Sequence, residues 1–178
     1  MTIMDKVEAT TRTSIQAIID KEPVSYLEAS NLYGKIASGR HNQSVLEVLY
    51  NHAQDPELKD LIKDGIDNLV IPTINDCEAL LEKSGAQTPH FHYCEHKLHK
   101  DLDIPNDARL TDYEISANIA IMARAAQLSL LAALQESYQL EVEGMFRKYL
   151  DAGLDWNYRL LQLMIHRGWL PHLAKITH

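Results

Sequence analysis

The chain has 178 residues, of which 46% are hydrophobic and 24% charged, and this ordinary globular composition excludes a disordered protein. The formal net charge of −8 argues against a nucleic-acid-binding surface, and two cysteines are too few for a disulfide framework. Only seven glycines and two phenylalanines occur beside many leucines, alanines and glutamates, which favours helix over sheet.

Residues 1–23 are predicted to form a helical arm. The pattern from Asp5 to Lys21 places Ile15, Ile18 and Ile19 together, and Glu22-Pro23 ends it. The same segment carries acidic residues early and lacks an apolar core, so we expect no secretory signal peptide.

Residues 24–178 are predicted to form a single domain, and its first helical hairpin covers residues 25–85. Ser25 and Glu28 have the spacing of a capping box, in which the hydroxyl accepts from a helical N–H and the glutamate reaches back. The helix that begins there keeps its apolar periodicity to about Gln54.

The second helix of this hairpin is predicted to begin at Asp55-Pro56, because aspartate is a good N-cap and proline at the first helical position loses no hydrogen bond. It ends at Ser84-Gly85, since glycine is favoured just past a helix C-terminus. Pro72 lies inside this helix and should kink it, because proline cannot donate a backbone hydrogen bond. A small-molecule pocket beside that kink is one functional hypothesis.

The second hairpin is predicted over residues 111–168, where Thr111 and Glu114 form another capping box. The helix that follows is apolar nearly all round, which predicts that it is the most buried element. We expect no membrane span, because polar residues interrupt its apolar stretch at Asn118, Arg124 and Gln127. After a weak break near residues 135–139, the last helix runs to Gly168.

The two hairpins repeat one pattern and are of equal length, so each should bury its apolar face against the other. Residues 86–110, between them, are long for a simple bundle connection and can run the length of a helix. The sequence therefore predicts an all-α, ferritin-like four-helix bundle with a long crossover and an extra N-terminal helix.

Ferritin-like di-iron sites need a Glu-x-x-His motif on each of two helices, and the sequence contains none. We interpret its glutamates as helix caps and solvated charges. The residues in question are Glu28, Glu47, Glu114, Glu136, Glu141 and Glu143.

The predicted crossover contains a second candidate for metal binding, because four of the nine histidines fall between residues 90 and 99. If residues 95–100 form a helical turn, His96 and His99 share a face that His92 and Cys94 can approach. Imidazole and thiolate ligands would suit zinc or another late transition metal. The alternative is an exposed His-rich loop without a ligand, and a nucleophilic Cys94 with a histidine base is a weaker hypothesis.

Two histidines on the first long helix, His41 and His52, are interpreted as structural, with His52 placed to favour the helix dipole. Arg124, inside the most apolar helix, should be paired or should extend to the surface. Its candidate partners are Asp64, Asp67 and Glu143.

Residues 24–172 resemble the Coat F spore-coat proteins and their relatives in spore-forming bacteria. Both hairpins open with the Thr/Ser-x-x-Glu box of that family, His52-Ala-Gln-Asp55 matches its His-x-x-Asp ending, and Leu163-Met164-Ile-His-Arg-Gly168-Trp169 matches its closing motif. Relatives often carry a histidine where Thr73 and Tyr158 stand. The resemblance implies a ferritin-like bundle, a cytoplasmic or spore-coat location, other coat proteins as partners and no established reaction.

We therefore expect a non-enzymatic structural or interaction protein that self-associates through helix faces as a homodimer or larger assembly. Large side chains beyond the needs of one helical seam support this expectation, and they are Tyr113, Trp156, Tyr158 and Trp169. The alternative is a metal-binding ferritin-like protein that holds zinc or iron in the His-rich loop or in the bundle core. We expect no catalytic residue and no other cofactor.

Overall fold

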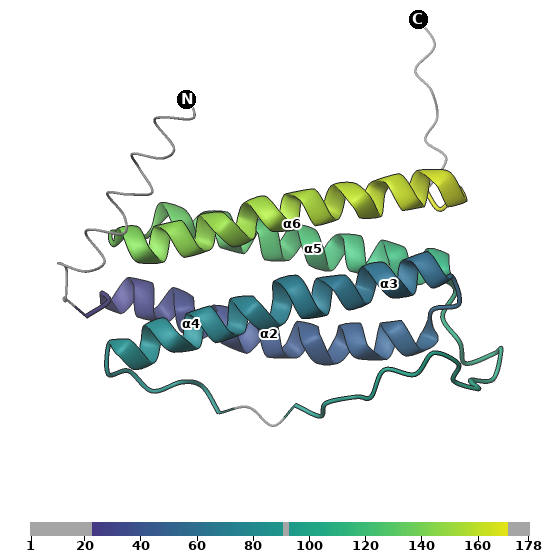
Figure 1. Ribbon diagram of the computed structural model, residues 1–178, viewed down its shortest axis with the longest axis horizontal. Helices are drawn as coiled ribbons and strands as arrows, with labels where there is room; N and C mark the ends of the chain where they lie inside the picture. The colour runs from purple at the N-terminus through teal and green to yellow at the C-terminus, as the bar shows by residue number, and fades with distance from the viewer. Residues whose placement is uncertain (1–22, 91–92, 171–178) are drawn as a thin grey trace, which may run out of the picture.

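Two helical hairpins pack against each other in the computed structural model, which describes residues 23–90 and 93–170 (Figure 1). These ranges contain no strand, so the predicted all-helical bundle is confirmed. The predicted N-terminal helix lies outside the described residues. The helical elements are α2 (Tyr26–His52), α3 (Pro56–Gly65), η1 (Ile66–Val70), α4 (Ile71–Lys83), α5 (Asp112–Gln135) and α6 (Leu140–Arg167).

The helix ends follow the local signals of the sequence. Both predicted capping boxes form: Ser25 and Thr111 each accept from the N–H of the glutamate three residues later, and each glutamate accepts in return. Asp55 caps α3, with Pro56 at its first position. Glycines with positive φ, 72° at residue 85 and 68° at residue 168, follow α4 and end α6.

The kink expected at Pro72 takes the form of a π-helical turn. Elements α3, η1 and α4 follow one another without a break, and η1 ends directly before the turn that holds Pro72. The N–H of Ile71 donates to the carbonyl of Ile66, one residue further back than in an α-helix. This wider turn accommodates a proline that would clash with a carbonyl of the preceding α-helical turn.

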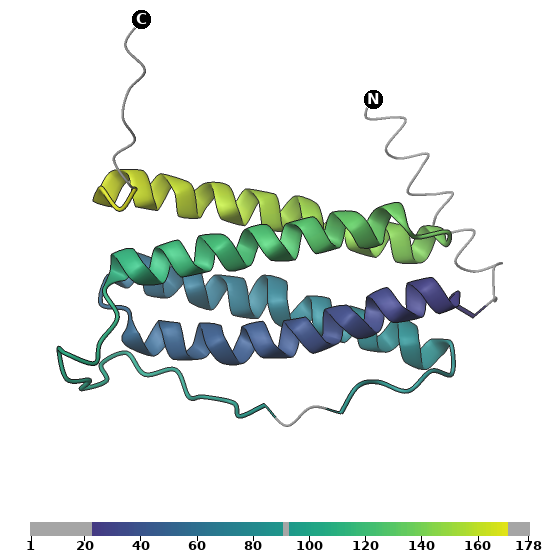
Figure 2. The ribbon, with the colours of Figure 1, turned by 180° about the vertical axis from the view of Figure 1, so that it is seen from behind.

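The connection between the hairpins runs back along the length of the bundle (Figures 1 and 2). It leaves the end of α4 and reaches the start of α5 beside the α2–α3 turn, so the second hairpin begins at the opposite end of the bundle from the first. Side chains of α2 hold the connection in place: Glu47 accepts from the N–H of His96, and Asn51 accepts from the N–H of His99.

Two carboxylates join the hairpins, one at each end of the bundle. Glu28, which is 1% exposed, accepts from the N–H groups of Tyr138 and Gln139 in the α5–α6 turn, at 2.9 and 2.8 Å. Asp112 accepts from the N–H groups of Gln54 and Asp55 in the α2–α3 turn, at 2.8 and 3.1 Å. The first turn of each hairpin therefore satisfies backbone donors in the other hairpin's turn.

The apolar core consists of two clusters, one toward each end of the bundle. One includes Leu49, Ile62 and Trp156, and the other includes Leu32 and Phe146. The prediction that α5 is the most buried helix is wrong, because only five of its 24 residues are buried. A helix at the corner of a four-helix bundle turns one side to the core, whatever the composition of its other sides. The buried residues of α5 are Ile115, Ser116, Ile119, Leu130 and Ala133.

Candidate functional site

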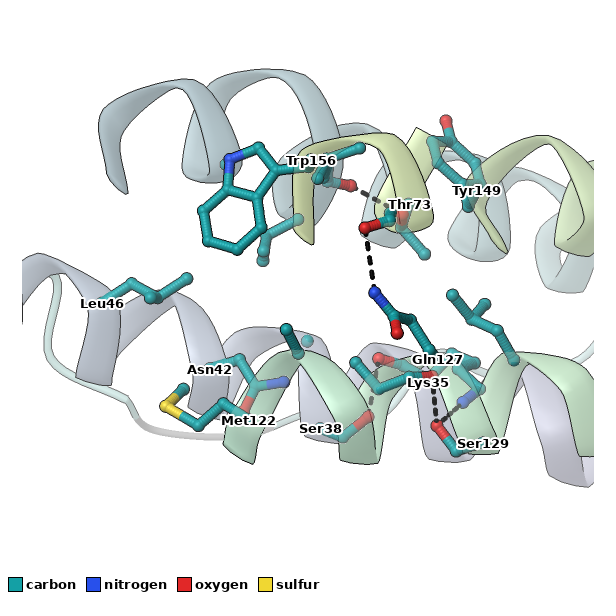
Figure 3. A pocket seen from close by; sticks show the side chains of 18 of the residues that line it. Lys35, Ser38, Asn42, Leu46, Thr73, Met122, Gln127, Ser129, Tyr149 and Trp156 are labelled. Carbon is teal, nitrogen blue, oxygen red and sulfur yellow. Dashed lines mark hydrogen bonds between the residues drawn. The ribbon is translucent and has the colours of Figure 1, made fainter. Parts of the chain in front are cut away.

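A cavity of about 130 Å³ lies between the two core clusters, beside η1. Helices α2 and α5 form one side of it, and α3, η1, α4 and α6 form the other (Figure 3). Its position beside the π-helical turn agrees with the hypothesis of a pocket near Pro72. The residues that line it are mostly apolar or small, so the few polar groups that reach it decide its chemistry.

Lys35 is the charged side chain of this cavity. It lies one turn after Leu32 on the inner face of α2, is 9% exposed, and donates a hydrogen bond to the Ser129 hydroxyl of α5. No carboxylate pairs with it among the described residues. Burial lowers the pKa of Lys35 to about 8.

Polar groups reach the cavity from several helices: Ser38 and Asn42 on α2, Thr73 on α4, and Gln127 and Ser129 on α5. Ser38 and Asn42 follow Lys35 at helical spacing, and Figure 3 shows all three on the α2 side. The Ser38 hydroxyl donates to the carbonyl of Gly34 at 2.8 Å. The Asn42 amide has no hydrogen-bond partner within the part of the chain that the structure describes. The cavity thus has a cation near one end and an amide about two helical turns away.

The opposite wall is apolar although its side chains carry polar atoms. The Trp156 indole N–H donates to the carbonyl of Leu61 at 3.0 Å, and the Tyr149 hydroxyl donates to Asp76 at 2.5 Å. Because these polar atoms are already bonded elsewhere, the rings offer the cavity mainly apolar surface. The wall therefore suits an apolar group rather than a second charge.

Gly65 allows the Trp156 ring to form this wall. A Cβ atom at residue 65 would lie 3.2 Å from three atoms of the indole, which is tighter than most real contacts. Glycine inside a helix is otherwise unfavourable, so its presence there is a signal of close packing that sequence analysis can use. Our sequence analysis missed the cavity residues, although a lysine among the apolar positions of α2 was a second such signal.

The predicted metal ligands of the crossover do not come together within the described residues. His92 lies outside them, and Cys94, His96 and His99 are exposed on an extended segment. Residues 95–100 form no helical turn, so the condition under which His96 and His99 would share a helical face is not met. No group of three potential metal-ligating side chains occurs in the described ranges. Zinc or iron binding stays a prediction.

The other residues that the sequence analysis singled out, His41, His52 and Arg124, lie outside the cavity. His52 Nδ1 accepts from the N–H of Leu110 at 3.2 Å, and the His41 ring contacts Tyr93 with ring centres 5.7 Å apart. The prediction that Asp64 or Asp67 pairs with Arg124 is wrong, because Asp64 pairs with Arg159 and Asp67 pairs with Lys63. Arg124 itself is exposed, which agrees with the expectation that it extends to the surface.

The outer face of α5 is apolar and exposed. Ile121 and Leu128 are 66% and 62% exposed, Leu131 is exposed beside them, and Ala125 lies between them at helical spacing. Helix α6 also exposes apolar side chains, including Tyr158. Trp156, which we expected to contribute to such a surface, is buried in the core. Within residues 23–90 and 93–170, α5 and α6 therefore present apolar faces that no other described element covers, and faces of this kind often mark interaction sites.

Helix α5 is also the one helix in the described ranges whose length and composition would allow it to cross a membrane. Its most apolar window has a mean hydropathy of 1.5, and 17% of that window is buried. A core helix would pass the same test with most of its surface buried, so α5 differs from a core helix.

Comparison with known proteins gives three findings. A family model described as "Protein of unknown function (DUF3231)" matches residues 13–173. The chain is 25% identical over 150 residues to the uncharacterized protein YvdQ of Bacillus subtilis strain 168, covering 84% of this chain and 86% of that protein. It is similar to the crystal structure of a candidate spore coat protein from Bacillus halodurans C-125, with a TM-score of 0.80, 24% identity, and 88% of this chain and 98% of that one covered. The structural likeness supports the fold.

Proposed function

This chain belongs to the DUF3231 family of proteins of unknown function, and we propose that it is a non-enzymatic structural protein of the spore-coat type that self-associates. The exposed apolar face of α5 carries this proposal. The likeness to a candidate spore coat protein, and the resemblance to the Coat F family with its ferritin-like bundle, support the spore-coat part. Other coat proteins are then further partners.

A second copy of the chain is the partner that fits the α5 face. Ile121 and Leu128 lie on either side of Ala125, so two α5 helices packed antiparallel about a twofold axis would place each Ile121 near the partner's Leu128. The small side chain of Ala125 lets two helix backbones approach closely. Arg124, the one charged residue between Glu114 and Glu136, borders the stripe and lacks an ion-pair partner among the described residues. A second copy of a chain with net charge −8 supplies carboxylates for it.

Sedimentation velocity on the full chain tests the proposal. The wild-type protein should sediment as a dimer or larger species, and Ile121→Glu with Leu128→Glu should convert it to a folded monomer. Leu27→Glu is the matched control, because Leu27 is also an exposed leucine but lies on α2. A wild-type monomer at high micromolar concentration would refute the proposal.

Two further measurements identify another occupant of the face. If the N-terminal segment covers α5 within one chain, deletion of residues 1–22 should turn a monomer into an associating protein. If a lipid surface covers it, the wild-type protein should float with lipid vesicles and the double variant should not. Either result replaces the self-association proposal.

Placement of the protein in a spore is tested separately. A fluorescent fusion produced in a sporulating Bacillus should collect at the forespore surface. The fusion with the double α5 substitution should collect there less, if assembly depends on this face. A fusion that stays evenly distributed in both forms contradicts the spore-coat proposal.

A further inference from the structure

We propose that the cavity beside η1 binds a small apolar carboxylate about the size of benzoate, with its carboxylate on Lys35 and Ser129 and its apolar body against Trp156. Lys35 lies on the inner face of α2 and the assembly face lies on α5, whereas Ser129 is exposed and directly follows Leu128 of that face in the chain.

The charge of Lys35 calls for an anion. A buried ammonium is normally paired with a carboxylate, because an unpaired charge in an apolar interior is strongly unfavourable. Here Lys35 donates to a neutral hydroxyl, and no carboxylate pairs with it among the described residues. An anionic ligand would supply the missing partner, and the Ser129 hydroxyl can donate a second hydrogen bond to it.

The volume and lining limit the rest of the ligand. A cavity of about 130 Å³ is close to the volume of about 150 Å³ that holds a benzene molecule in an engineered apolar cavity. Ala123 and Ala126 on α5 and the Trp156 ring on α6 line it with apolar atoms. A compact ring or a short branched chain fits this space, and a second charge does not.

The remaining titratable groups do not compete for the role of Lys35. From α4, Cys77 is fully buried, and burial raises the pKa of its thiol to about 12, so it stays neutral. From α6, burial together with the hydrogen bond to Asp76 raises the pKa of Tyr149. Helix α5 contributes no titratable side chain to the cavity lining. Lys35 is therefore the group whose charge a ligand would sense.

Isothermal titration with benzoate and with its neutral analogue benzamide tests the proposal on the full chain. Benzoate should bind at about millimolar concentration or lower, as a ligand of its size can. Benzamide should bind at least tenfold more weakly, because it cannot pair with the ammonium. Benzoate affinity should fall by about tenfold per pH unit above pH 8, as Lys35 loses its proton before the anion binds.

Two variants locate the site. Lys35→Met removes the charge and keeps the length of the side chain, so it should weaken benzoate binding by about tenfold or more while leaving benzamide binding unchanged. Ala126→Leu should fill the cavity and weaken both ligands. Lys63→Met is the matched control, because Lys63 is exposed on α3 and outside the cavity, and its benzoate affinity should equal that of the wild type.

The proposal fails if no heat is detected with benzoate up to about 10 mM. It also fails if benzamide binds as tightly as benzoate, since that result describes an apolar cavity in which Lys35 plays no part. The comparison of benzoate with benzamide uses the wild-type chain alone, so it tests the role of Lys35 even if a variant does not fold.

Discussion

Replacement of Glu28 by alanine should reduce the free energy of unfolding by about 2–4 kcal/mol at neutral pH. The carboxylate accepts four hydrogen bonds: two from Ser25, through its N–H and its hydroxyl, and one each from the N–H groups of Tyr138 and Gln139. The bond from the Ser25 N–H is one half of the α2 capping box, whose other half is the Glu28 N–H donating to the Ser25 hydroxyl. The bonds from Tyr138 and Gln139 fasten the turn of the opposite hairpin. Alanine removes both functions at a side chain that is 1% exposed.

Glu114 provides the matched control. It forms the same capping box with Thr111 at the start of α5, but it is exposed and its carboxylate bonds to Thr111 alone among the described residues. Glu114→Ala should therefore lose the local cap alone and destabilise the protein clearly less than Glu28→Ala. Urea denaturation followed by far-UV circular dichroism measures both.

The effect of Glu28 should depend on pH. Burial tends to raise its pKa, but hydrogen bonds from Ser25, Gln139 and Tyr138 to the carboxylate outweigh burial and lower it from 4.5. A carboxyl whose pKa is lowered on folding stabilises the protein above its unfolded pKa, and this contribution is lost as pH falls through the folded value. The stability difference between wild type and Glu28→Ala should shrink below about pH 4.5. Equal effects of the two alanine variants at neutral pH would refute the role of Glu28 in joining the hairpins.

The pKa of Lys35 is about 8 in the folded protein and 10.5 for an ordinary lysine, so the unfolded chain binds more protons between these pH values. As pH rises through that range, the free energy of unfolding of the wild type should therefore increase by roughly 2–4 kcal/mol relative to Lys35→Met. A difference that stays constant in urea titrations from pH 7 to pH 10 would contradict this. Gly65→Ala should lower stability by about 1 kcal/mol through the indole 3.2 Å from the new Cβ, whereas Gly34→Ala, with open space around it, should raise stability by about 0.5–1 kcal/mol in thermal unfolding. Zinc at equimolar concentration should leave the melting temperature unchanged, because His96 and His99 are exposed on an extended segment. A submicromolar zinc affinity that is lost when both histidines are replaced by alanine would instead support the metal-binding alternative.

The sequence by itself determined the elements whose causes are local. Ser25 and Thr111 lie three residues before a glutamate, Asp55 lies before a proline, and Gly168 follows the last helix, and all four end or begin helices where these short-range interactions require. The matching hairpins and the all-helical class follow from the same signals, because a helix is defined by contacts within a few residues.

Only the tertiary structure decided which side of each helix is covered. The composition of α5 is apolar on most sides, so the sequence could not distinguish the buried Ile119 from the exposed Ile121. Tryptophan is a residue type common at interfaces, but Gly65 on another helix makes room for Trp156 in the core. The same holds for Lys35, whose cavity exists because α2, η1, α5 and α6 meet beside a π-helical turn. Burial depends on neighbours distant in sequence, and a pattern within one helix does not contain that information.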